Sequence, residues 1–155
     1  MRPGKRGRIV VGVDGSEPSQ RALEWAAHEA VLRQANLRVV HAVQLYVRTL
    51  GLPTSPRLFS ADVRYPGDLL EAGRDLLDAE IARLGLKDKA VEVSSELVRY
   101  PPAAALVEES KLAELLVLGS RRRRVLPRLI RASVPEQCAK AAHCPVVVVG
   151  ARAEM

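Results

Sequence analysis

Three short stretches of the chain are almost entirely apolar. They span residues 9–13, 115–118 and 146–149, and the first two are followed by the turn-forming residues Asp14 and Gly119. Apolar runs of this length are typical of strands that are buried on both faces of a parallel sheet. We therefore predict a buried strand at each of the three.

Two further stretches have the pattern of strands in less buried positions. Residues 37–45 are mostly apolar, and we predict the second strand of the chain there. Val91 and Val93 alternate with Glu92 and Ser94, which leaves one face polar. Such alternation is typical of an edge strand or of a strand with one solvated face.

Apolar residues at helical spacing mark two long helices. Ser16 is a good N-cap for the first helix, which we expect to end near residues 35–36. Its predicted buried face consists of Leu23, Ala26, Ala27, Ala30 and Val31. The second helix is predicted from the spacing of Leu70, Leu77, Ile81 and Leu84, with Gly85 as its stop.

Proline and capping residues mark two shorter helices. Pro101 and Pro102 open a helix from about Ala103 to Lys111, since proline is tolerated only in the first turn. Residues 133–136 form a capping box with proline in the first turn. The helix that follows is predicted to run to about Ala142.

The alternation of strands and helices determines the fold class. It predicts an α/β protein, a three-layer doubly wound sheet of five parallel strands with four helices. We expect a single domain over residues 1–155, with a basic tail at 1–7 and a long loop at 46–67 that carries several prolines and glycines. Such folds bind ligands at the carboxyl ends of their strands, here residues 14–16 and 119–120.

The positive charge of the chain is confined to two patches. The 155 residues carry a net charge of +6, but residues 1–8 hold four basic residues and residues 121–131 hold six arginines, with no acidic residue in either. The remainder has a net charge of −4, from 14 basic and 18 acidic residues. Such patches suit phosphate, nucleic acid or an acidic partner. None of the five aromatic residues lies in either patch, which disfavours single-stranded nucleic acid.

Several classes of protein are excluded by local composition. No apolar run approaches the roughly 20 residues that a membrane span needs, and the apolar stretch near the N-terminus ends at Asp14, too early for an export signal. Cys138 and Cys144 match no common zinc or redox spacing. We therefore expect a cytoplasmic protein with two buried, reduced thiols, no bound metal and no membrane association.

The order of these motifs resembles the universal stress protein family. Residues 9–16 resemble its first strand and turn, and residues 41–43 the end of its second strand. Residues 116–121, 133–134 and 144–149 resemble its C-terminal signature. The resemblance implies a Rossmann-like fold of strand order 3-2-1-4-5 and a cytoplasmic stress-response protein. It also implies a homodimer through the last strand, Val146, Val147, Val148 and Val149, and for most members no established catalytic role.

One branch of this family binds ATP through the pattern Gly-x2-Gly-x9-Gly-Ser/Thr. In this chain the pattern begins at Gly119 and ends at Ser133, but Arg122 and Ala132 replace the second and third glycines. Glycines in phosphate loops allow positive φ and let backbone N–H groups approach the phosphate closely. The nine-residue gap is intact, so the two glycines have been substituted rather than misaligned.

The resemblance implies a set of ligand-contacting residues. They are Asp14, Ala42, Gly119, Arg122, Ala132, Ser133 and Val134. Each of the polar ones also has a simpler interpretation, because Asp14 favours a turn and Ser133 caps a helix. The flanking apolar residues favour a hydrogen-bonded strand-end role for His41 over that of a general base. No nucleophile–base pair or P-loop is present, so no catalytic residues are predicted.

Three functions remain open on the sequence. The first is a dimeric regulatory module with an unidentified protein partner, whose site for ATP or another adenine nucleotide is absent or altered. The second is an ATP-binding protein in which arginine side chains replace the glycine contacts, since arginine binds phosphate in a bidentate manner. The third is a nucleic-acid-binding protein that uses the Arg121–Arg131 patch.

Overall fold

The predicted alternation of strands and helices is confirmed. A computed structural model describes residues 6–43, 66–85, 91–120 and 133–150. The elements are β1 Arg8–Gly12, α1 Glu17–Arg33, β2 Asn36–Val43, α2 Pro66–Leu84, β3 Val93–Arg99, α3 Pro102–Ser110, β4 Leu115–Gly119, α4 Val134–Ala141 and β5 Val146–Val149.

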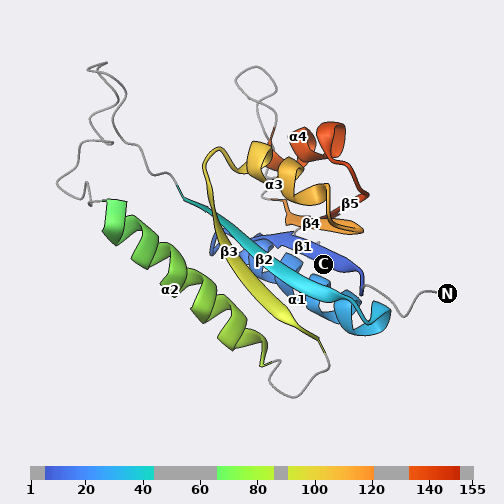
Figure 1. Ribbon diagram of the computed structural model, residues 1–155, viewed down its shortest axis with the longest axis horizontal. Coiled ribbons are helices and arrows are strands. Elements are labelled where there is room, and N and C mark those ends of the chain that lie inside the picture. Colours follow the sequence, from blue (N-terminus) through green and yellow to red (C-terminus); the bar gives the residue numbers. More distant parts are fainter. Residues whose placement is uncertain (1–5, 44–65, 86–90, 121–132, 151–155) are drawn as a thin grey trace, which may run out of the picture.

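The five strands form one parallel sheet with helices on both faces. The strand order is β3-β2-β1-β4-β5, as the family resemblance implied. Helices α1 and α2 cover one face, and α3 and α4 cover the other (Figure 1). Strand β1 lies in the centre, with β2 on one side and β4 on the other. The first two crossovers, β1-α1-β2 and β2-α2-β3, therefore run in one direction along the sheet. The third, β3-α3-β4, returns past β1, and β5 then extends the sheet on the other side.

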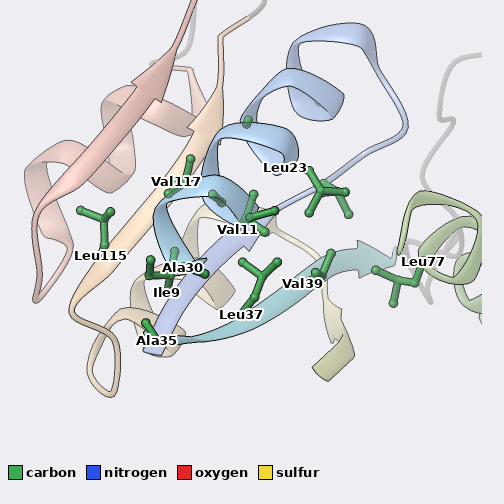
Figure 2. Packing of buried hydrophobic residues seen from close by; sticks show 14 residues of the cluster. Ile9, Val11, Leu23, Ala30, Ala35, Leu37, Val39, Leu77, Leu115 and Val117 are labelled. Atoms are coloured by element: carbon green, nitrogen blue, oxygen red, sulfur yellow. The ribbon is translucent and has the colours of Figure 1, made fainter. Parts of the chain in front are cut away.

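The larger core lies between the sheet and α1, with a contribution from α2. Ile9, Val11, Leu37, Val39 and Val117 project from alternate positions of the three central strands and are completely buried. Figure 2 shows them packed against Leu23 and Ala30 of α1 and Leu77 of α2. These strands bury both faces, which explains why their sequences are continuously apolar.

The smaller core lies on the opposite face of the sheet. Val10, Val40 and Leu116 pack there against Leu106 of α3 and Cys138 of α4. Cys138 is buried as expected, whereas Cys144 is only half-buried, because it lies in the exposed connection between α4 and β5. Both thiols are free.

Four details of the sequence-based assignment are wrong. Helix α2 begins at Pro66, so the end of the predicted loop 46–67 is helical, as proline in a first turn permits. Val91 precedes β3, which starts at Val93. Leu70 and Val31 share the helical spacing of buried residues but are 38% and 41% exposed. Leu70 lies one turn from the start of α2. Val31 lies at the margin of the buried face of α1, since its neighbour Ala30 is completely buried.

Residues 44 and 45 of the predicted second strand, the rest of loop 46–67 and the whole Arg121–Arg131 patch fall outside the described residues. Within the described part of the chain, no helix combines the length and the apolar character needed to cross a membrane.

Candidate functional site

The carboxyl edge of the sheet brings most of the predicted site residues together. All five strands are parallel, so β1, β2 and β4 end at the same edge, with Asp14, Ala42 and Gly119 at or just beyond their ends. Helices α1 and α4 each follow a strand and run back, so both begin at this edge. It is also where the strand order reverses, the usual position of a ligand site in an open α/β sheet.

The turn after β1 is closed by hydrogen bonds among its own residues. The Ser16 N–H donates to Asp14 Oδ1 at 2.9 Å, which orients the carboxylate. Gly15 has φ of +82°, a left-handed conformation that glycine adopts without strain. Ser16 also caps α1, its hydroxyl accepting from the Ser19 N–H. Asp14 itself is exposed at the edge of the sheet.

His41 binds the end of β1 from the neighbouring strand. Its Nδ1 lies 2.7 Å from the Val13 carbonyl oxygen. A carbonyl oxygen only accepts, so Nδ1 carries the proton and His41 has the strand-end role that its sequence context favoured. Ala42 follows His41, is half-buried and pairs with Val98 of β3.

Gly119 lies in close contact with the beginning of α1. A Cβ atom at this position would stand 2.4 Å from both the carbonyl carbon and oxygen of Pro18, and 2.7 Å from the Ser19 nitrogen. All three are backbone atoms, which have little freedom to move aside. The fold therefore needs glycine at 119 whether or not a ligand binds. Its presence in this chain is not, by itself, a sign of a phosphate site.

The start of α4 also lies at the carboxyl edge. The Ser133 hydroxyl accepts from the Glu136 N–H at 3.3 Å, so Ser133 is the N-cap that the capping box predicted. Val134 is the first residue of the helix and packs against the smaller core. Arg122 and Ala132, the two substituted positions of the glycine pattern, lie outside the described residues.

Ser19 is a buried polar residue that the sequence analysis missed. It is 5% exposed, and its hydroxyl accepts from the Asp14 N–H at 3.2 Å and donates to the Ser16 carbonyl at 3.1 Å. The signal was weak in the sequence, because a serine in the first turn of a helix is ordinary. Only the fold shows that this serine reaches back to the strand end.

Apart from these residues, the described part of the chain offers a hollow on α2 and two free thiols. A shallow hollow on α2 is lined by Asp68, Glu71, Ala72 and Asp75. Among the described residues no three His, Cys, Asp or Glu side chains are placed to hold a metal ion.

Neither cysteine is an activated nucleophile. Burial raises the pKa of the Cys138 thiol to about 11, and burial also raises the pKa of the Cys144 thiol.

Solved structures of similar fold include complexes with adenine nucleotides. A universal stress protein crystallised with cAMP superposes with a TM-score of 0.70 at 23% identity, covering 92% of this chain and 96% of that one. A universal stress protein from Archaeoglobus fulgidus in complex with dAMP has a TM-score of 0.61 at 26% identity, covering 92% and 97%.

Sequence relatives belong to the same group. A universal stress protein of Mycobacterium tuberculosis is 36% identical over 148 residues, which are 96% of this chain and 49% of that protein. The chain thus spans about half the length of this relative. A universal stress protein of Methanocaldococcus jannaschii is 31% identical over 146 residues, covering 92% and 81%. The profile of the universal stress protein family matches residues 5–150, and this chain belongs to that family.

Proposed function

We propose that this chain is a cytoplasmic regulatory module that binds an adenine nucleotide at the carboxyl edge of its sheet. In this proposal the nucleoside and its nearest phosphate are held, and a triphosphate is held weakly. The observation that supports it is the convergence of Asp14, Ala42 and Ser133 near the strand-order reversal of a universal stress protein fold. The Archaeoglobus relative in complex with dAMP supports a monophosphate as the ligand class.

The residues have separate roles in this site. Asp14 accepts hydrogen bonds from a ribose or base, since its carboxylate is held in place by the Ser16 N–H. Ala42 provides a small half-buried surface beside it. The N-terminal end of α4, beginning at Val134, offers its dipole to a phosphate.

The weak hold on a triphosphate follows from the glycine pattern. Gly119 is retained, but its close approach to the Pro18–Ser19 backbone is sufficient reason for that. Arg122 and Ala132 replace the two other glycines. A non-glycine residue in a left-handed conformation costs about 1–2 kcal/mol, and each lost charge-assisted hydrogen bond about 1.5–3 kcal/mol. Together these costs correspond to a loss of more than tenfold in ATP affinity.

Titration calorimetry with AMP and ATP tests the proposal. The wild-type chain is expected to bind AMP at least as tightly as ATP. The double substitution Arg122→Gly and Ala132→Gly is expected to strengthen ATP binding by about tenfold or more, although it removes a positive charge. Failure to bind AMP at millimolar concentration would overturn the proposal.

A second candidate is favoured by the run of four arginines at 121–124, which begins two residues after the end of β4 in the sequence. In that case the arginine side chains hold the phosphates in place of backbone N–H groups. The same titration separates the two. Tight ATP binding in the wild type that Arg122→Gly abolishes would identify arginine as the phosphate ligand.

We also propose that the module is a homodimer that pairs through β5. This strand lies at the edge of the sheet, and Val148 is 45% exposed there. Exposed apolar edge strands are usually covered or paired in native proteins. Pairing with β5 of a second copy would give a two-fold symmetric interface.

A further inference from the structure

The peptide unit that joins Val13 to Asp14 has an unusual pair of partners. Its carbonyl oxygen, that of Val13, accepts from His41 Nδ1 at 2.7 Å. Its N–H, that of Asp14, donates to the Ser19 hydroxyl at 3.2 Å. Both polar groups of one peptide plane are thus bound by side chains, one from β2 and one from α1, at the point where the chain leaves the sheet.

These two contacts differ from those of the preceding residues. The Val13 N–H still donates to the Val40 carbonyl at 2.8 Å, as in a regular ladder. Beyond Val13 the chain leaves the sheet, and the pairing of β1 with β2 ends although β2 itself runs on to Val43. The two side chains therefore take over from the sheet at this peptide unit.

Together the His41 and Ser19 contacts form a clamp on the Val13–Asp14 peptide unit. This clamp has a direct consequence for the Asp14 carboxylate. Rotation of the Val13–Asp14 peptide plane would redirect the Cα–Cβ bond of Asp14 and break its contact with the Ser16 N–H. The Ser19 hydroxyl also donates to the Ser16 carbonyl at 3.1 Å, which ties both ends of the turn to one atom. Ser19 is buried and its backbone lies against Gly119, so it has little freedom to move.

We infer that Ser19 and His41 are positioning residues for the ligand site. They hold the Asp14 carboxylate in its binding orientation before any ligand arrives. The binding part of this inference rests on the proposed function, whereas the clamp itself does not. Groups held in place before binding lose less conformational freedom when the ligand arrives. Loss of the clamp should therefore weaken ligand binding.

The chain offers a matched control for Ser19. Ser110 is buried like Ser19, and its hydroxyl likewise accepts from a backbone N–H, that of His143 at 2.9 Å. It also donates to a backbone carbonyl, that of Val107 at 2.6 Å. Ser110 lies at the end of α3, away from the Asp14 turn. Ser19→Ala and Ser110→Ala therefore remove equivalent hydrogen bonds at different places.

Calorimetry with AMP compares Ser19→Ala, His41→Phe, their double variant and Ser110→Ala, with urea unfolding measured for each. We expect the two single variants to weaken AMP binding by about tenfold each. The double variant should be weakened far less than the product of the two, because both side chains hold one peptide plane. Ser110→Ala should lower stability to a similar extent as Ser19→Ala and leave AMP affinity within about twofold.

Ligand-free amide spectra provide a readout that does not depend on nucleotide. The signals of Gly15 and Ser16 should shift in both Ser19→Ala and His41→Phe and stay in place in Ser110→Ala. Unchanged Gly15 and Ser16 signals would overturn the clamp, whether or not AMP binds. An equal loss of AMP affinity in Ser110→Ala would overturn the positioning role. Absence of AMP binding in the wild type, with the shifts observed, would refute the proposed function and the positioning role while leaving the clamp intact.

Discussion

At the scale of single residues, the carboxyl edge is organised by a few close backbone contacts. Gly119 lets the end of β4 approach the Pro18–Ser19 backbone, and Gly15 supplies the left-handed residue of the turn. Packing requires glycine at 119, and backbone geometry favours glycine at 15. The fold alone therefore explains Gly119, whereas glycines at 122 and 132, which this chain lacks, would serve a phosphate ligand.

Gly119→Ala should destabilise the protein strongly. The added methyl overlaps Pro18 backbone atoms, and overpacking of this kind typically costs about 1–3 kcal/mol, here at the upper end because no side chain can move aside. Urea unfolding measures the change. Gly150→Ala is the control, since no described atom lies within 4 Å of the added methyl there. Equal stability of the two variants would contradict the close-approach argument.

Cys138 should make stability depend on alkaline pH. Burial raises its pKa from 9.0 to about 11, so between these values the folded state keeps the proton that the unfolded state has lost. The contribution to stability is complete below pH 9 and declines as pH rises toward 11, by up to about 1.4 kcal/mol per unit. The slope of unfolding free energy against pH should be shallower in Cys138→Ala. Parallel slopes would show that the thiol is not the group responsible.

At the scale of elements, polar side chains join helices that share a face of the sheet. Glu80 of α2 is 7% exposed and accepts from Gln20 of α1 and from Arg83, each at 3.2 Å. Arg83 also contacts Glu24 of α1. Leu76 of α2 lies beneath Gly15, so the position of α2 bears on the Asp14 turn.

Glu80→Ala should loosen α2 without unfolding the sheet. It removes the acceptor for Gln20 and for Arg83, a loss of about 1–3 kcal/mol because the carboxylate is largely buried. Hydrogen exchange should quicken for the amides of α2 and stay slow in β1. Asp78→Asn, on the exposed side of α2, should leave exchange unchanged. Equal protection of α2 in Glu80→Ala and the wild type would mean that apolar contacts alone hold this helix.

At the scale of the whole molecule, the two edges of the sheet differ in character. The β3 edge carries polar residues such as Ser95 and Glu96, both exposed. The β5 edge consists of four valines, of which Val147 and Val149 pack toward α1 and Val146 toward α4. Of these four valines only Val148 is exposed, at 45%, and this apolar edge is better suited to pairing with another chain than the polar β3 edge.

Val148→Lys should convert the proposed dimer into a monomer. A charged side chain at the centre of a two-fold interface meets its own copy or is desolvated, and either is costly. Light scattering of the wild type should give twice the mass of one chain, and that of Val148→Lys the mass of one. Leu112→Lys, at a position 76% exposed near the end of α3, should remain dimeric. A monomeric wild type would refute the β5 pairing.

The elements, their order and the fold class could all be predicted from the sequence, because these depend on local patterns. Continuous apolar runs located the buried strands, and Ser16 and Ser133 located two helix starts. The family resemblance supplied the strand order and the expected ligand residues. Local patterns extend over a few turns of helix or one strand, so they are sufficient to locate individual elements.

Which residues meet across the fold could be learned only from the three-dimensional arrangement of the elements. It showed that Gly119 approaches the start of α1, and that His41 and Ser19 bind the same peptide unit although 22 positions separate them in the sequence. It also showed that Leu70 and Val31 are exposed to solvent. The burial of a helical residue depends on how the helix packs against the sheet as well as on the spacing of its apolar residues. Contacts between distant segments follow from packing as a whole, which no local pattern contains.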